Sequence, residues 1–264
     1  MALKAYKNLD FLNSKPARPL RILSEYLEPR SRFDHYKVTD TVVFFGSARA
    51  IAEDEAKKGL DEARNGGDDA AIARAQQQLD LSRYYEEARA LAGRVTEWSK
   101  ALDLPERRFI VSTGGGPGIM EAANRGASEA SGLSIGLGIS LPFEATMNPY
   151  ITRELGFEFH YFFMRKFWFA YMAKAMIVFP GGFGTLDELF EVLTLVQTQK
   201  INRKIPIVLY GEEFWDDVMT LDGLEKWGTI SPGDLDLMHR SSTVDDAFDY
   251  VTAELKRLHL QPQD

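Results

Sequence analysis

The chain has 264 residues, of which 45% are hydrophobic, and it carries a net charge of −8 at pH 7 with a pI near 5.2. This length and composition predict one globular domain with appendages, and the acidic balance argues against broad nucleic-acid binding, which requires a basic surface. Because the sequence contains no cysteine, disulfides, thiolate catalysis and cysteine-ligated metals are excluded.

Residues 1–40 predict an N-terminal arm. Apolar residues recur at helical spacing over 20–27, and three prolines surround this segment. We therefore expect a short helix in a proline-interrupted arm that packs on the domain or on a neighbouring subunit. No catalytic role is expected for the arm.

Residues 41–264 predict a single domain in which strands and helices alternate. Strands joined through helices require right-handed crossovers and a parallel sheet. The fold class is therefore α/β: a Rossmann-like, doubly wound parallel sheet with helices on both faces, whose ligands bind beyond the carboxyl ends of the strands. Apolar, β-rich runs predict strands at Thr41–Phe45, Arg108–Ser112, Leu133–Leu141, Phe157–Phe162, Lys174–Phe179 and Ile205–Tyr210, and helical patterns cover 163–174, 184–200, 213–227 and 244–260.

The segment from about 53 to 100 predicts a helical insertion. It is rich in strong helix formers and is broken once, at Asn65–Asp68. A breaker between two such stretches favours a helical hairpin with a longer second limb. Because such charged hairpins usually form a solvated face or an oligomer contact, we assign it no chemistry.

Three glycine-rich turns follow predicted strands, at 46–49, 113–118 and 180–184. Glycine lets the backbone adopt positive φ and approach a ligand without obstruction by a side chain. In the third turn, the glycines lead to Thr185 in the first turn of a helix, where free amides and the helix dipole suit a phosphate. Glu188 lies one turn further along, and we expect the dipole to favour its ionised form.

The stretch Pro180–Glu188 reads Pro-Gly-Gly-x-Gly-Thr-x-x-Glu. This resembles the signature of the LONELY GUY (LOG) family of nucleoside 5'-monophosphate phosphoribohydrolases, which include cytokinin-activating enzymes and were long mislabelled lysine decarboxylases. The run Gly114–Gly116 is similar to the family's upstream motif. Neither cluster completes a dinucleotide fingerprint, and there is no Gly-Lys-Ser/Thr of a triphosphate loop.

The resemblance implies a catalytic pair, Arg165 and Glu188. From the residues alone, Arg165 and Lys166 in an aromatic helix could instead extend their charged tips to water. For Lys166 and for Arg49, at the expected start of a helix, the functional and the solvated interpretations both stay open. Glu121 and Asn124 could orient a ligand, but helix capping or solvent exposure would also explain them. The implied substrate contacts are Ser47, Gly115, Gly116, Glu144, Lys166, Gly181, Gly182, Gly184, Thr185 and Glu191.

The expected reaction is hydrolysis of the N-glycosidic bond of a purine riboside 5'-monophosphate, a cytokinin precursor among the candidates. The alternatives are a nucleotide or molybdenum-cofactor carrier of the same fold, and an amino-acid decarboxylase that would need pyridoxal phosphate on a lysine. No cofactor or metal is expected, since the four histidines are scattered without ligand spacing. Ser134 matches a hydrolase elbow literally, but a helix precedes it where a strand is required, so we reject it as a nucleophile.

The expected partners are the nucleotide substrate and further copies of the chain. The aromatic helix at 163–174 is apolar nearly all round, which predicts burial between the sheet and a partner subunit. We expect a cytoplasmic protein with no membrane contact, because the sequence has neither a signal peptide nor a run of about 18 apolar residues.

Overall fold

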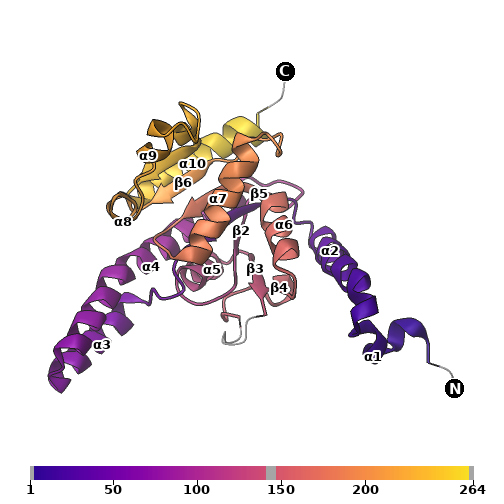
Figure 1. The fold of residues 1–264 in the computed structure, drawn as a ribbon, viewed down its shortest axis with the longest axis horizontal. Coiled ribbons are helices and arrows are strands. Elements are labelled where there is room, and N and C mark those ends of the chain that lie inside the picture. Colours follow the sequence, from indigo (N-terminus) through magenta and orange to yellow (C-terminus); the bar gives the residue numbers. More distant parts are fainter. Residues whose placement is uncertain (1–2, 141–146, 262–264) are drawn as a thin grey trace.

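A seven-stranded parallel sheet lies at the centre of the computed structural model, which describes residues 3–140 and 147–261 (Figure 1). The strand order is β4-β3-β2-β1-β5-β6-β7, so the direction of winding reverses between β1 and β5. Ligands of such sheets bind where the connections diverge in this way. The strands are β1 (Thr41–Phe45), β2 (Ile110–Thr113), β3 (Ser134–Ile139), β4 (Gly156–Phe159), β5 (Ala173–Val178), β6 (Ile207–Tyr210) and β7 (Met238–Ser241).

Helices cover both faces of this sheet. Strand β1 shows why, since Val42 and Phe44 belong to one apolar cluster and Val43 and Phe45 to the other. Successive side chains of a strand point to opposite faces, so a strand that is apolar throughout needs cover on both sides. The helices are α1 (Leu9–Leu12), α2 (Arg18–His35), α3 (Glu53–Gly66), α4 (Asp69–Ala101), α5 (Ile119–Glu129), α6 (Phe162–Met172), α7 (Phe183–Gln197), α8 (Glu212–Val218), α9 (Asp222–Lys226) and α10 (Val244–His259).

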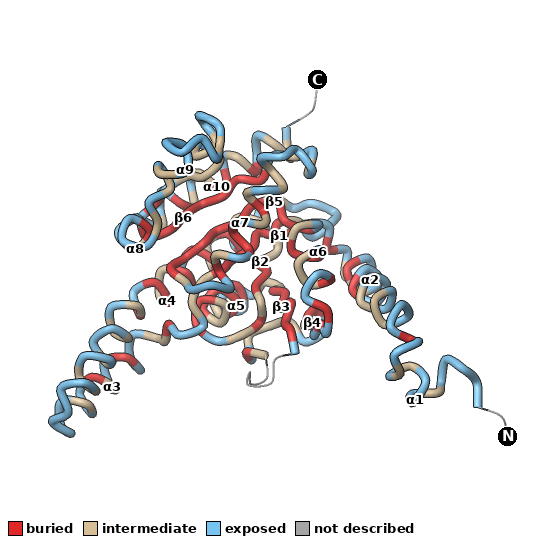
Figure 2. Tube along the Cα trace, in the orientation of Figure 1, coloured by how far each residue is buried: buried red, intermediate tan, exposed pale blue. Residues whose placement is uncertain are grey.

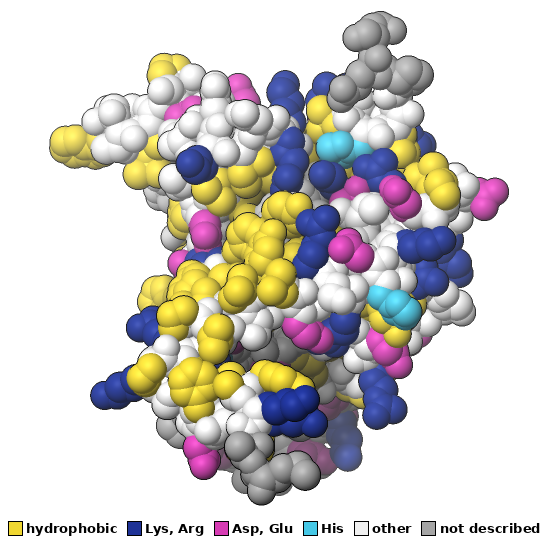
Figure 3. Space-filling view, turned by 90° about the vertical axis from the view of Figure 1, so that its right-hand side faces the viewer, with side chains coloured by type: hydrophobic (Ala, Val, Ile, Leu, Met, Phe, Trp, Pro, Cys, Tyr) yellow, Lys and Arg dark blue, Asp and Glu magenta, His cyan; other side chains and the backbone are white. Residues whose placement is uncertain are grey.

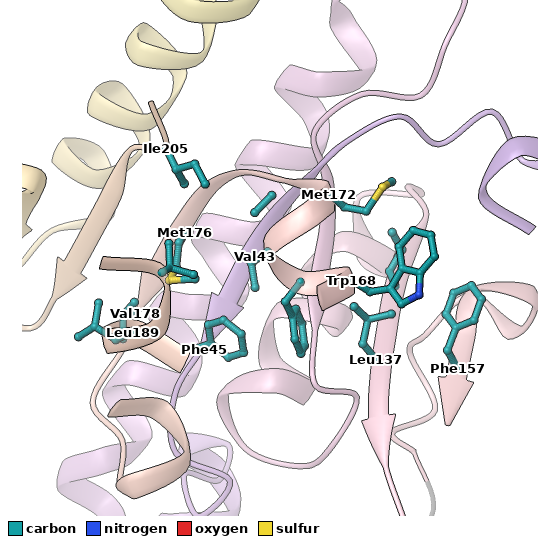
Figure 4. Close-up of a cluster of buried hydrophobic side chains, with 14 of the residues drawn as sticks. Val43, Phe45, Leu137, Phe157, Trp168, Met172, Met176, Val178, Leu189 and Ile205 are labelled. Carbon is teal, nitrogen blue, oxygen red and sulfur yellow. The ribbon is translucent and has the colours of Figure 1, made fainter. Parts of the chain in front are cut away.

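The two apolar clusters use different helices. Helices α4, α5 and α10 bury one face of the sheet, whereas α2, α6, α7 and α8 pack on the other. Figure 2 shows the buried residues concentrated in the strands and in the parts of the helices next to them. On the second face, Trp168 of α6 lies beside Leu137 and Phe157 of the sheet (Figure 4). The sheet and α6 therefore share one continuous core. This confirms the predicted α/β class.

Helices α3 and α4 form a hairpin that projects from the sheet (Figure 1). Gly67 takes a left-handed conformation with φ of 72° and ends α3. Asp68 then begins α4 by accepting a hydrogen bond from the amide of Ala70. The helices thus end and start at the predicted break, because glycine and a capping aspartate favour those positions.

Three elements differ from the sequence-based expectation. Helix α2 runs on past Pro29, because Trp168 bonds the carbonyl that the proline leaves free. The predicted helix 213–227 is two helices, since Met219 adopts an extended backbone and packs against the core. Strand β7 was not predicted. Its sequence, Met-His-Arg-Ser, has no apolar run, and it forms at the sheet edge only by pairing with β6.

Candidate functional site

The three glycine-rich turns meet at the carboxyl edge of the sheet, next to the reversal between β1 and β5. The amide of Ser47, after β1, donates to the carbonyl of Pro180 after β5 at 2.8 Å. The carbonyl of Ser47 accepts from the amide of Ile119, at the start of α5, at 3.0 Å. The turn after β1 therefore joins the other two into one backbone structure.

The turn between β5 and α7 presents open backbone amides. A Cβ at Gly181 would lie 2.1 Å from Oγ1 of Thr185, so only glycine fits there. At Gly182 and Gly184, in contrast, a Cβ would meet nothing within 4 Å. Gly182 is the residue before α7, so the first amides of the helix have no partner within it. An anion can approach these amides without obstruction.

The turn between β2 and α5 is held by buried polar side chains. Asn148 donates its side-chain amide to the carbonyls of Gly115 and Gly116 at 3.2 and 3.0 Å, and to Oδ1 of Asn124 at 3.0 Å. Thr113 donates its hydroxyl to the same Oδ1 at 2.7 Å. Asn124 thus stabilises the turn from a fully buried position, which contradicts the solvated interpretation of this residue. The role of Asn148 could not be predicted from the sequence, because a single asparagine in a loop forms no recognisable motif.

Arg165 of α6 and Glu188 of α7 form a buried ion pair. Nη2 of Arg165 lies 3.1 Å from Oε1 of Glu188, and their side chains are 16% and 4% exposed. The guanidinium also lies over the rings of Phe162 and Phe169, at 5.3 and 5.8 Å from the centroids. Arg165 therefore points inward to α7, not outward to water, and two aromatic contacts restrict its position.

Burial raises the pKa of Glu188, although Arg165 and Lys166 act in the opposite direction. The expectation that the helix dipole would favour the ionised form was wrong. Desolvation of a residue that is 3% exposed outweighs the opposing effect of the neighbouring cations. A carboxyl group with a raised pKa is a stronger base when ionised, which is typical of a group that accepts or donates protons in catalysis.

Lys166, the neighbour of Arg165, forms ion pairs with two other acidic residues of α7. Its Nζ lies 2.8 Å from Oδ2 of Asp187 and 2.7 Å from Oε2 of Glu191. Burial by itself lowers the pKa of Lys166, but the hydrogen bonds to these carboxylates outweigh it and raise the pKa overall. The same three residues line an open groove of about 440 Å³ along the helix, so this charged cluster is accessible to a ligand.

The other candidates take varied places. Oγ of Ser47 accepts from the amide of Arg49, whose own side chain is exposed. Glu121 accepts a hydrogen bond from the hydroxyl of Tyr85 at 2.9 Å. Ser134 is buried at the start of β3, directly after α5, in the helix-then-strand order that rules out a hydrolase elbow. Glu144 lies outside the described residues.

Within 3–140 and 147–261, no group of three or more His, Cys, Asp or Glu side chains could hold a metal ion. No helix in the same part of the chain combines the length and apolar character needed to cross a membrane.

Known proteins were compared with this chain. No curated protein matches it. Among solved structures, the Moco carrier protein from Chlamydomonas reinhardtii is 19% identical with a TM-score of 0.48, over 83% of this chain and 99% of that one. The molybdenum cofactor binding protein from the phototrophic bacterium Rippkaea orientalis is 20% identical with a TM-score of 0.44, over 64% and 86%.

A family model described as possible lysine decarboxylase matches residues 120–251, half of the chain. The match runs from the start of α5 into α10, and it includes the turn after β5 and both members of the Arg165–Glu188 pair. The chain therefore belongs to the possible lysine decarboxylase family, the LOG type of domain that the motif at Pro180–Glu188 indicates.

Proposed function

We propose that this protein hydrolyses the N-glycosidic bond of a purine riboside 5'-monophosphate and releases the free base and ribose 5-phosphate. One observation carries the proposal: a buried glutamate, Glu188, pairs with Arg165 one helical turn beyond the open amides at the start of α7. A phosphate on those amides would bring the attached ribose next to the carboxylate. Gly182, Gly184 and Thr185 would bind the phosphate, with Gly115, Gly116 and Ser47 facing it.

The reaction needs a general base that activates water and a group that stabilises a developing positive charge. As the bond between ribose and base breaks, positive charge develops at the anomeric carbon, and a nearby carboxylate stabilises it. Ionised Glu188 takes a proton from the attacking water, whose oxygen bonds to the anomeric carbon. The electron pair of the broken bond leaves with the nucleobase, which takes a proton from solvent, and Glu188 returns its own proton to solvent. Arg165 holds the carboxylate in place, and Lys166 and Glu191, which line the open groove, would bind ribose hydroxyls.

Chemistry at lysine supports this proposal over decarboxylation. A lysine that forms a Schiff base must be neutral, which requires a lowered pKa. Lys166, beside the glycine turn, has a raised pKa because Asp187 and Glu191 bond its ammonium group. Burial does lower the pKa of Lys174, but that residue lies at the amino end of β5, at the edge of the sheet opposite the turns. Neither lysine combines a lowered pKa with a place beside the glycine turns.

We also propose that the protein acts as a homo-oligomer. Helix α6 was expected to be buried, yet in the single chain Phe162, Phe163, Phe167 and Tyr171 are 37–50% exposed. Four exposed aromatic side chains on one helix next to the site form an apolar surface that a second copy would cover. Light scattering coupled to gel filtration tests this, and a monomer at micromolar concentration would contradict it.

The decisive assay is incubation with adenosine 5'-monophosphate and chromatography of released adenine. The wild type should release adenine. Glu188→Gln should lose at least 100-fold in kcat, in line with the effect of removing a general base, about 10²–10⁴-fold. Glu225→Gln, an exposed glutamate of α9, is the matched control and should retain full activity. Tight binding of the nucleotide without adenine release would instead indicate a carrier of the same fold. A panel of other nucleoside monophosphates then identifies the preferred base.

A further inference from the structure

Helix α2 of the N-terminal arm contains a proline at an interior position, Pro29. Proline has no amide hydrogen, so the carbonyl four residues earlier, that of Glu25, loses its helical partner. Nε1 of Trp168 in α6 donates to this carbonyl at 2.9 Å. Trp168 is completely buried and packs against Tyr26 and Phe33 of the arm, with ring centroids 5.8 and 5.3 Å away. Pro29 thus leaves a free carbonyl in α2, and this carbonyl accepts a hydrogen bond from α6.

The side chain of Glu25 contacts the beginning of the same helix. Its carboxylate accepts hydrogen bonds from the amides of His160 at 2.9 Å and Tyr161 at 3.2 Å, immediately before α6. Tyr161, the residue that precedes α6, provides no side-chain cap of its own. A carboxylate at this end also interacts favourably with the helix dipole. Glu25 therefore holds the backbone that leads into α6 from outside the helix.

Glu25 binds α6 at two points that flank Arg165. Its carboxylate holds the backbone at Tyr161, four residues before Arg165, and its carbonyl holds Trp168, three residues after. The amide of Arg165 bonds the carbonyl of Tyr161 at 3.2 Å, so the first turn of α6 transmits the position of the cap. Further contacts fasten the arm, since Arg32 donates to two carbonyls just before and at the start of β4. Figure 3 shows hydrophobic side chains on the side of the molecule where α2 lies in Figure 1.

We propose that Glu25 is a positioning residue for the Arg165–Glu188 pair, so that the N-terminal arm is part of the catalytic apparatus. This inference rests on the proposed hydrolysis. A catalytic group must be held within a fraction of an ångström, and a displacement of 1 Å can lower a rate by about 100-fold. Residues that lock the backbone on both sides of Arg165 supply that constraint.

The test compares Glu25→Ala, Glu25→Gln and the control Asp10→Ala, which removes an exposed carboxylate from α1 of the same arm. With adenosine monophosphate as substrate, Glu25→Ala should lose roughly 10- to 100-fold in kcat with KM changed less than about threefold. Glu25→Gln keeps one of the two acceptor oxygens and should recover part of the rate. Asp10→Ala should match the wild type.

A second readout separates positioning from a purely structural effect. Glu188 is faced by Arg165 and Lys166 of α6 and by Glu191 of its own helix. If Arg165 moves away, the acidic limb of the pH profile of kcat/KM should shift to higher pH in Glu25→Ala, whereas a fall in the folded fraction lowers the whole profile without moving the limb. Trp168→Phe, which removes the second contact but keeps the aromatic packing, should shift the limb in the same direction.

The outcomes are distinguishable. If Glu25→Ala and Trp168→Phe both turn over like Asp10→Ala, or lose rate without any shift of the acidic limb, the positioning role is refuted. If the alanine variant fails to fold, the phenylalanine variant decides by the same criterion. If the wild type itself releases no adenine or other base, the proposed function is wrong. In that case amide exchange at His160 and Tyr161 still shows whether Glu25 holds the backbone that leads into α6.

Discussion

Replacing Arg165 by methionine should destabilise the protein in a pH-dependent way. The change removes the guanidinium that faces Glu188 and keeps a flexible apolar side chain of similar length. Breaking a buried ion pair by removing one partner typically costs about 3–5 kcal/mol. Because the Arg165 side chain is 16% exposed and Lys166 remains nearby, the lower end applies, about 3 kcal/mol at pH 8. For a chain of this size that corresponds to a fall in Tm of roughly 6–12 °C.

The pH dependence follows from the protonation of Glu188. Burial already raises the pKa of this carboxyl above its ordinary value of 4.5, and loss of the guanidinium raises it further. Between the unfolded and folded pKa values the native state then binds more protons than the unfolded state, so stability falls as pH rises through this window. As the pH falls through the raised pKa, the buried carboxyl takes up a proton and becomes neutral. The difference between variant and wild type should therefore shrink to below about 1 kcal/mol.

Urea unfolding followed by tryptophan fluorescence measures both values, since the chain has four tryptophans. The double variant Arg165→Met with Glu188→Gln should recover most of the loss at pH 8, because no buried charge remains unpaired. An equal loss at pH 5 and pH 8, or no recovery in the double variant, would refute the reasoning.

Three further predictions concern the turns and the site. Gly181→Ala should lower stability by about 1–3 kcal/mol in urea unfolding, because its Cβ would lie 2.1 Å from Thr185, whereas Gly182→Ala, with open space around it, should stay within about 0.5 kcal/mol. Ser134→Ala should keep full kcat in the adenine assay and lose about 1 kcal/mol of stability, since its hydroxyl donates only to the carbonyl of Tyr150. A large loss of kcat would instead indicate that Ser134 is a catalytic residue. The acidic limb of the wild-type profile of kcat/KM should lie above pH 4.5, the ordinary value for glutamate, and a limb at or below it would contradict the raised pKa of Glu188.

Local sequence patterns were enough to predict several of the strands and turns of this protein. The continuous apolar runs of β1 and β5 specify strands that are buried on both faces, and the glycines that follow them specify turns. The start of α7 was also predictable, because Gly181 to Thr185 contains the flexible backbone and the first-turn residue that such a turn needs. These signals lie within a few residues of one another, so they can be recognised without knowledge of the fold.

Tertiary structure decided what depends on distant residues. Glu188 has a raised pKa chiefly because it is buried, whereas its place near the start of α7 indicates the opposite effect of the helix dipole. Helix α2 continues through Pro29 because a tryptophan 139 residues later supplies the missing donor. Asn148 holds the turn after β2 only because the chain returns to that turn after β3. Desolvation and hydrogen-bond partners are properties of three-dimensional packing, so no local pattern could report them.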